Sequence, residues 1–390
     1  MPPASSDQSL LLVDNEFPVR WLRRLRLVPP NSLGILRRAI VLALLSWLPI
    51  VIWSTTMSRM GGEPVAGESL LRHYGVHVRC LLAIPLLIVA EVPLQNILQQ
   101  LIHQFRASEI VTTGPNSAFD RLIDEVRKVR DLTVPWIIVL GGALAWAVAS
   151  QPSVHDDTMI WAVDTSGKLG FGGWWFAYVA NSIYTALVLA WLWRILLVTW
   201  CFWRIGRLDL SIVPTHPDRA GGLGFLDKLP RAFGLVGFVL SATISSRWAH
   251  EIVVHGTLIG TFQLPALLFA GLWTLYLLMP LLVLTPAMFV ARERALPDYG
   301  ALVGKQGRLV HRRWIKHEEV EDETIIEAPG IGVMADAAAM YDAASKMRFA
   351  PVSVKVLLQI LVPIAVPFIV VASFQIPLGQ MLLKLGKAIA

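Results

Sequence analysis

Long apolar runs recur along the chain and determine its architecture. A helix needs roughly 20 mostly apolar residues to cross the hydrocarbon core of a bilayer, because lipid cannot satisfy an open backbone. We predict membrane-spanning helices at residues 39–57, 79–98, 134–150, 174–200, 232–254, 264–290 and 354–374. The predicted fold class is therefore an all-α, polytopic helical membrane protein.

The last of these runs is interrupted by Pro363 and Pro367. Proline removes a backbone donor and kinks a helix, so this run fits either a kinked span or a re-entrant segment buried against the other helices. The pattern consequently predicts six to seven spans, with interfacial and cytoplasmic helices beside them.

Composition supports a membrane protein and excludes other classes. Hydrophobic residues make up 55% of the chain and charged residues 16%, and the mean hydropathy is +0.58. The apolar runs are continuous, whereas a β-barrel needs short alternating strands. The two cysteines, Cys80 and Cys201, provide neither a disulfide framework nor a zinc knuckle. The first run starts near Ala39, too late for a cleavable signal peptide.

Basic residues are distributed unequally between the connecting segments. Of the 34 lysines and arginines, 25 lie in segments 1–38, 103–133, 203–231 and 291–353, and only 5 lie in the alternate segments. This asymmetry predicts a cytoplasmic N-terminus. The pI near 9.5 then reflects contact with lipid headgroups and not with nucleic acid. The pattern resembles that of bacterial multi-pass proteins, which implies a cytoplasmic (inner) membrane.

Four regions follow from these boundaries. Residues 1–38 are a cytoplasmic arm with a basic interfacial helix, and residues 39–290 are a six-span bundle. Residues 291–353 are a cytoplasmic helical segment expected to form a small cap, and residues 354–390 hold the seventh run and a tail. Apolar residues at helical spacing from Leu94 to Phe105 predict that the second span continues into the cytoplasm.

Polar side chains inside the spans gather in the outer half of the predicted membrane. Arg247, His250 and Glu251 share one face of the fifth span, and Asn181 lies on a polar face of the fourth. Glu91, near the middle of the second span, is the most costly residue to insert. We therefore predict an outward-facing cavity between spans two, four and five, with Glu91 at its floor.

A purely structural role is the alternative for these residues. Glu91 or Glu251 could pair with Arg247 simply to hold the bundle together. Arg194, roughly 30 Å from the outer start of its span, is expected to reach the inner interface as an anchor.

Two histidines, His73 and His77, are spaced to share a helix face just outside the second span. Two histidines are an incomplete metal site, since zinc takes three or four protein ligands. His250, Glu251 and His255 are the candidates for completing it.

The segment before the fifth span is dense in special residues. His216, Asp218 and Arg219 precede Gly221 and Gly222. A glycine-rich turn beside an arginine can bind phosphate, and a His with an Asp can perform acid/base chemistry or hold a metal. No P-loop sequence accompanies this loop, so a rigid turn with Asp218 as a helix cap is the alternative.

These observations give three functional hypotheses. The leading one is a transporter or channel for a small ion that enters through the outer cavity. The second is a membrane enzyme that acts on a lipid headgroup or phosphate compound at the glycine-rich loop. The third is a non-catalytic sensor or assembly subunit. The chain lacks the GxSxG, HExxH, kinase and Rossmann sequences, and the sequence leaves open which cofactor, if any, it binds. A homo-oligomer is compatible with all three.

Overall fold

The computed structural model describes residues 34–57, 69–112, 114, 117–150, 157–163, 167–317 and 330–376. The described residues are about 81% helical, and they contain no strand beyond an isolated bridge between Val163 and Leu169. Seven of the described helices are long and apolar enough to cross a membrane. The protein is thus an all-α polytopic membrane protein, as predicted.

The helices follow one another with short connections, and several spans contain more than one helical segment. The elements are α2 (Ile35–Thr56), η1 (Leu70–Arg72), α3 (Tyr74–His77), η2 (Val78–Ala83), α4 (Ile84–Val89), α5 (Glu91–Ala107), α6 (Ala118–Asp131), α7 (Val134–Ala149), η3 (Asp157–Ala162), α8 (Phe171–Trp175), η4 (Phe176–Ala180), α9 (Asn181–Ile205), η5 (Gly224–Lys228), α10 (Leu229–Val254), α11 (Gly260–Leu282), α12 (Thr285–Val310), η6 (His311–Ile315), α13 (Gly330–Ser345) and α14 (Val354–Ala372).

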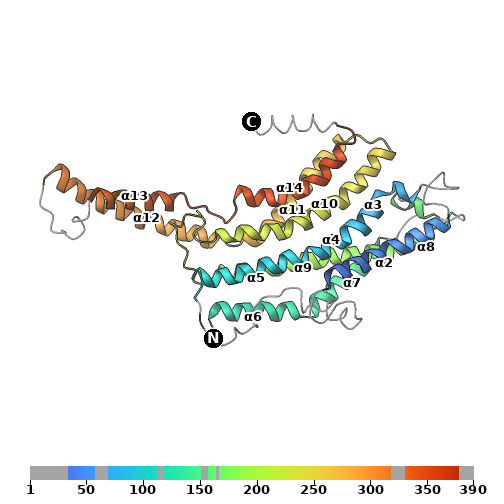
Figure 1. The fold of residues 1–390 in the computed structure, drawn as a ribbon, viewed down its shortest axis with the longest axis horizontal. Helices are drawn as coiled ribbons and strands as arrows, with labels where there is room; N and C mark the ends of the chain where they lie inside the picture. The colour runs from blue at the N-terminus through green and yellow to red at the C-terminus, as the bar shows by residue number, and fades with distance from the viewer. Residues whose placement is uncertain are drawn as a thin grey trace.

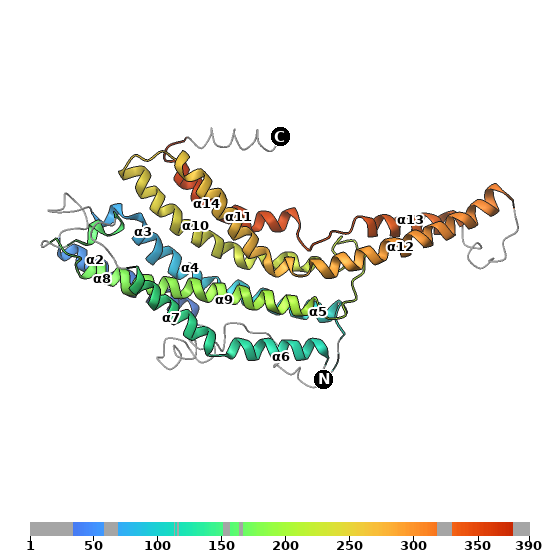
Figure 2. The ribbon, with the colours of Figure 1, turned by 180° about the vertical axis from the view of Figure 1, so that it is seen from behind.

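Helix α10 is the most buried span, with α14 along one side and the segments from α3 to α5 along another (Figure 1). Helix α9 packs against α7 and α11, and α2 packs against α4 and α8 (Figure 2). Leucines on α11 are strongly exposed, as expected for a lipid-facing helix: Leu264, Leu267 and Leu272.

The second and fourth spans are longer than predicted. Their helical segments run over Tyr74–Ala107 and Phe171–Ile205, which at 1.5 Å per residue is roughly 50 Å each. They extend beyond the apolar core at the end where α12 and α13 leave the bundle, here called the arm end. The opposite end, where α3 and α8 begin, is called the pocket end. The predicted continuation of the second span is confirmed, because Leu94, Leu101 and Phe105 are buried in α5.

The sixth span ends earlier than the predicted boundary at residue 290. Helix α11 stops at Leu282, and α12 starts at Thr285 after a short turn. Pro286 lies in the first turn of α12, where its missing N–H is not needed. Residues 285–290 therefore belong to the next helix.

The seventh run forms one helix, α14, with Pro363 and Pro367 inside it. Its 19 residues make it long and apolar enough to span a membrane. Helix α14 approaches α10 closely, because a Cβ at Gly234 would lie 2.7 Å from the carbonyl oxygen of Gln359 and one at Gly237 would lie 2.7 Å from Ile364. Small residues at such spacing allow two membrane helices to pack backbone to backbone.

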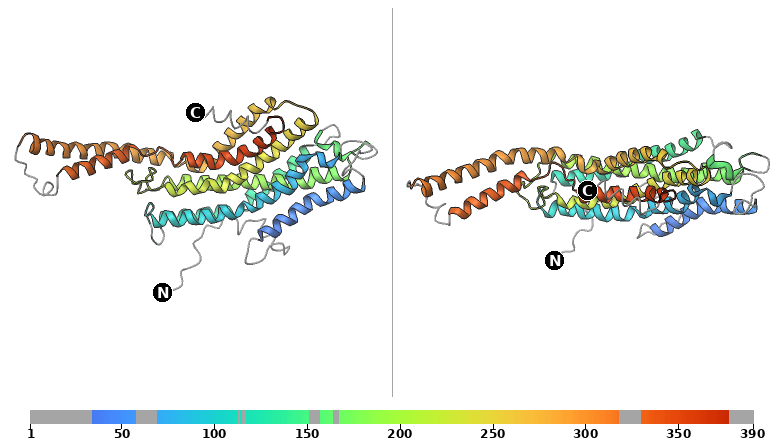
Figure 3. Two further views of the ribbon diagram at one scale, coloured as in Figure 1. Left: turned by 45° about the horizontal axis from the view of Figure 1, so that its top comes forward. Right: turned by 90° about the horizontal axis from the view of Figure 1, so that it is seen from above.

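Helices α12 and α13 pair as a hairpin that projects away from the bundle (Figures 1 and 3). It does not form the expected cap. Arg292 of α12 fixes its base, donating to the carbonyl of Ser345 at 2.8 Å and stacking on the ring of Phe349. The predicted interfacial helix within residues 1–38 lies outside the described residues.

Candidate functional site

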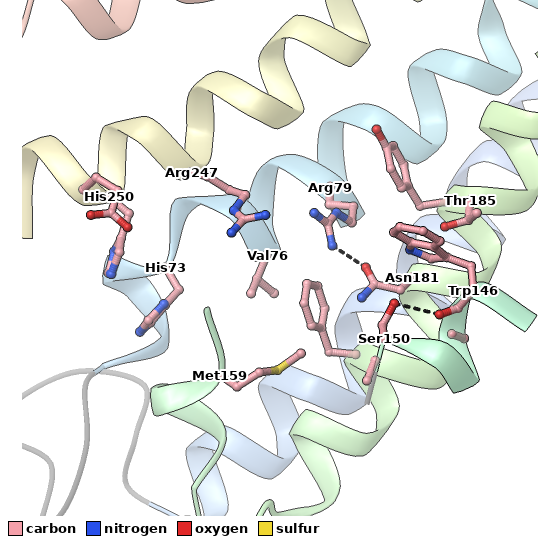
Figure 4. A pocket seen from close by; sticks show the side chains of 16 residues that line it. His73, Val76, Arg79, Trp146, Ser150, Met159, Asn181, Thr185, Arg247 and His250 are labelled. Atoms are coloured by element: carbon pink, nitrogen blue, oxygen red, sulfur yellow. Dashed lines mark hydrogen bonds between the residues drawn. The ribbon is translucent and has the colours of Figure 1, made fainter. Parts of the chain in front are cut away.

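A polar pocket opens among the spans at the pocket end (Figure 4). Its volume is about 330 Å³, and most of its lining comes from four spans, the second, third, fourth and fifth, with Met159 of η3 and His73 beside them. The lining includes Asn181, Arg247, His250 and Glu251, which the sequence assigned to one cavity. These four residues are therefore brought together, whereas Glu91 is not among them.

Arg79 is a charged lining residue that the sequence did not assign to the cavity. Its guanidinium donates to Oδ1 of Asn181 and lies 5.3 Å from the ring centres of both Phe176 and Tyr184. These partners are an amide oxygen and two aromatic faces, so they hold the guanidinium in place without neutralising its charge. The sequence signal was an arginine at the start of an apolar run, which resembles an ordinary interfacial anchor.

Two π-helical turns border the pocket. The turn η2 contributes Arg79, and the turn η4 contributes Phe176 and Ala177. Pro85, which has no N–H for the carbonyl four residues earlier, closely follows η2. π-Helical turns are rare and occur frequently at functional sites, because they displace side chains from the regular helical register.

His73 and His250 form a stacked pair at the edge of the pocket, with ring centres 4.5 Å apart. Nδ1 of His250 also lies 3.1 Å from the carbonyl oxygen of Arg72. Burial, together with the neighbouring His250 and His77, lowers the pKa of His73 to about 3, and burial is the largest of these causes. His73 is therefore uncharged at neutral pH.

The predicted metal pair of His73 and His77 is not assembled. Trp47 donates its indole N–H to Nδ1 of His77 at 3.1 Å, which leaves Nε2–H to donate to the carbonyl oxygen of Leu70 at 3.1 Å. Both ring nitrogens of His77 are thus engaged in holding α2 and η1 together. Among the described residues, no cluster of three or more His, Cys, Asp or Glu side chains could hold a metal ion.

Glu91 lies in a separate buried charge cluster, which corrects its predicted place at the pocket floor. Arg38 donates to both carboxylate oxygens, at 2.8 and 3.3 Å, and Arg194 lies 3.0 Å from Oε1. Glu91 is fully buried, and Arg38 and Arg194 are only 5% and 3% exposed. Arg194 is therefore a buried ion-pair partner and not the predicted interfacial anchor, because Glu91 offers it a carboxylate inside the bundle.

An apolar layer separates the pocket from this cluster. It consists of Ile84, Leu87, Ile88 and Trp191, all essentially without solvent exposure. The indole N–H of Trp191 donates to the carbonyl oxygen of Leu87 at 2.8 Å, tying the fourth span to the second. Glu91 is 12 residues beyond Arg79, which is roughly 18 Å along a helix. The four apolar side chains thus lie between the pocket lining and the charge cluster along the second and fourth spans.

The glycine-rich loop at the arm end is organised around Asp218. Its carboxylate accepts backbone N–H bonds from Ala220, Gly222 and Gly224 at 2.7, 3.2 and 2.7 Å. Partial burial alone would raise the pKa of Asp218, but these bonds outweigh it and lower the pKa below its ordinary value. His216, 45% exposed, has its Nδ1 2.9 Å from Oδ1 of Asp218.

This loop is also a structural junction. Arg348, which follows α13, donates its backbone N–H to the carbonyl of Arg219 at 2.9 Å and its side chain to the carbonyl of Asp218 at 3.1 Å. Arg219, Gly221 and Gly222 have positive φ, as a tight turn requires. Because Asp218 already occupies the backbone N–H groups that a phosphate would need, the geometry favours the rigid-turn interpretation of the loop.

No protein-family model matches this chain, and neither does any curated protein or solved structure.

Proposed function

We propose that this protein is a membrane transporter that takes a small ion from outside the cell into the pocket at the pocket end. One observation carries the proposal: a polar pocket, lined by charged side chains, lies among four membrane-spanning helices. Charged groups inside a membrane bundle are costly to insert and typically mark the pathway of an ion or polar solute. A volume of about 330 Å³ suits a small solute.

The apolar layer below the pocket supports a carrier more than a continuously open channel. An ion in the pocket meets the apolar layer of Ile84, Leu87, Ile88 and Trp191 before it can reach the arm end. A transporter that alternates access must open such a layer while it closes the other side. The π-helical turns η2 and η4 and the break at Ala90 between α4 and α5 are the places where the helices are least regular.

The proposal includes an orientation in which the pocket faces outward. The described parts of the basic segments 103–133, 203–231 and 291–353 lie toward the arm end (Figure 1), so the positive-inside rule supports a cytoplasmic arm end and an outward-facing pocket. A cytoplasmic (inner) membrane with the N-terminus inside is the location that this orientation supports.

Flux into proteoliposomes tests the proposal. Vesicles containing the purified full-length protein are given tracer sodium, potassium, chloride or phosphate, and uptake is compared with protein-free vesicles. We expect uptake of at least one ion, and we expect Arg247→Gln, in the pocket, to reduce it. Arg231→Gln is the matched control, because Arg231 is an exposed arginine at the other end of α10. If no ion enters faster than in protein-free vesicles, or if both variants behave alike, the proposal is wrong.

A further inference from the structure

The charge of Arg79 is not compensated by an acidic side chain. Its contacts are Oδ1 of Asn181 and the faces of Phe176 and Tyr184, and no ion pair joins it to a carboxylate among the described residues. The Nε atom of Arg79 is buried and has no hydrogen-bond partner in the same part of the chain. A guanidinium in these surroundings attracts an anion, since removal from water strengthens its field.

Arg247 is the second unpaired cation of the pocket. Its side chain is exposed toward the pocket, and it forms no ion pair with any described residue, including Glu251 one helical turn further along α10. Both side chains line the pocket: Figure 4 shows Arg247 reaching from α10 toward the second span and Arg79 reaching from the second span toward Asn181 of α9. Among the described lining residues, two arginines thus face a single carboxylate, and His73 adds no charge at neutral pH.

Asn181 provides a neutral donor beside these cations. Because its Oδ1 accepts the bond from Arg79, its amide NH₂ group remains as a donor. Two guanidinium groups and an amide N–H are the donor set that proteins use for carboxylates and oxyanions, because guanidinium forks match pairs of negatively charged oxygen atoms.

We propose that the pocket binds a small anion through negatively charged oxygen atoms, held between Arg79 and Arg247 with Asn181 as a further donor. The ligand is a small carboxylate or an inorganic oxyanion such as phosphate, which share this chemistry. The inference rests on the proposed transport function and narrows it to anions. With about 330 Å³ available, the pocket holds such an anion together with several waters.

Ligand-dependent thermal stability of the full-length protein in detergent tests the proposal without requiring flux. The probes are acetate and inorganic phosphate, each titrated at constant ionic strength and pH with a large organic sulfonate as the replacement anion. A ligand that binds only the folded state raises the melting temperature in a saturable manner. We expect one or both probes to do so, and which one does distinguishes a carboxylate site from a phosphate site. Exchanging sodium for potassium or choline is expected to have no effect.

The variants identify the residues responsible. Arg247→Gln is expected to weaken anion binding by about tenfold or more, because it removes a charge-assisted contact. Arg79→Gln is expected to do the same, but Arg79 also packs against Phe176 and Tyr184, so that variant could destabilise the bundle. If Arg79→Gln does destabilise the bundle, Arg247→Gln still tests anion binding, because Arg247 is exposed and its replacement leaves the packing intact. Arg231→Gln is the control and should bind like the wild type.

The outcomes separate this inference from the transport proposal. Saturable anion binding that Arg247→Gln weakens supports the anion site, even if proteoliposomes show no flux. No saturable effect of either probe, or equal binding by wild type and Arg247→Gln, overturns it. A cation flux without anion binding also overturns it, although transport itself would then stand.

Discussion

At the scale of single residues, the buried cluster of Glu91, Arg38 and Arg194 is the costliest feature of the bundle. Each charge has lost its water, and the short contacts between the carboxylate and the two guanidinium groups offset part of that loss. The cluster joins three spans, since Arg38 belongs to α2, Glu91 to α5 and Arg194 to α9. We interpret it as a structural tie that is distinct from the pocket.

Glu91→Gln is therefore expected to destabilise the protein strongly. Removing one partner of a buried ion pair typically costs about 3–5 kcal/mol, because the remaining charges stay buried without compensation. Thermal unfolding in detergent measures the effect. Glu125→Gln is the control, since Glu125 pairs with Arg204 at 2.8 Å while about half exposed, and such pairs contribute roughly 0–1 kcal/mol. Similar melting temperatures for the two variants would show that the cluster does not stabilise the packing of the three spans.

The buried histidine at the pocket edge makes a prediction about pH. The pKa of His73 is about 3 in the folded protein and 6.5 ordinarily, so the unfolded chain takes up the proton first. Stability is fully present above pH 6.5 and falls as the pH drops toward 3, by at most about 1.4 kcal/mol per pH unit. His73→Gln should flatten this dependence in melting curves recorded across the range. His103→Gln, at an exposed position, should not.

The sequence predicted least well which side chains contact one another in the folded protein. Helical spacing placed Arg247, His250 and Glu251 on one face correctly, because spacing is a local property. It could not show that Arg38, 53 residues before Glu91, would reach that carboxylate. Helical spacing also could not distinguish Arg79 from an interfacial anchor, because the contacts of Arg79 lie on the fourth span, far away in the sequence.

At the scale of elements, the pairing of α10 with α14 explains why the seventh run is a helix against the bundle. Gly234 and Gly237 let the two backbones approach, and Gln359 and Ile364 fill the space that side chains would take. The prolines of α14 were a reason to doubt a span. Their effect on the helix is accommodated because neighbouring helices pack around it.

Gly234→Ala is expected to loosen this contact. The added methyl group would lie 2.7 Å from a backbone oxygen of Gln359, so α14 must move, at a cost of about 1–3 kcal/mol. Gly271→Ala in α11 is the matched control, because a Cβ there meets nothing within 4 Å. It should be neutral or stabilise slightly, since alanine favours a helix over glycine. A lower melting temperature for Gly271→Ala than for Gly234→Ala would contradict this account of the packing.

Existence and type of the spans were predictable from the sequence, whereas several boundaries were not. Apolar length marks the part of a helix that crosses lipid, but α5 and α9 continue as helices beyond it on buried stripes such as Leu101 and Phe105. The run at 264–290 contained a turn at Val283 and Leu284, two apolar residues that carry no turn signal. Hydropathy indicates whether a residue lies in lipid or in water, and it does not indicate where a helix ends.

At the scale of the whole molecule, helix α3, which lines part of the pocket, and the α12–α13 hairpin lie at opposite ends of one bundle (Figure 1). When such a bundle spans a membrane, its two ends contact different aqueous compartments. The proposed orientation exposes the pocket to the outside and the hairpin to the cytoplasm, where it is also available to a partner.

Labelling of introduced cysteines tests this orientation in intact cells. Both native cysteines, Cys80 and Cys201, are buried, so background labelling should be low. A membrane-impermeant maleimide should label Leu258→Cys, at the pocket end, without cell lysis. It should label Ala338→Cys, on the exposed face of α13, only after lysis. The reverse result would place the pocket in the cytoplasm.

The apolar layer beneath the pocket also has an electrical consequence. A polar pocket shares the potential of the solution it faces, so most of the membrane voltage falls across the layer of Ile84, Leu87, Ile88 and Trp191 and what lies below it. A full crossing changes the energy of one charge by about 2.3 kcal/mol per 100 mV. An inward step of a lone anion against an inside-negative voltage is therefore uphill. Uptake of such an anion therefore needs either an inward concentration gradient that outweighs the voltage or cations that travel with it, whereas the voltage favours export of the same anion.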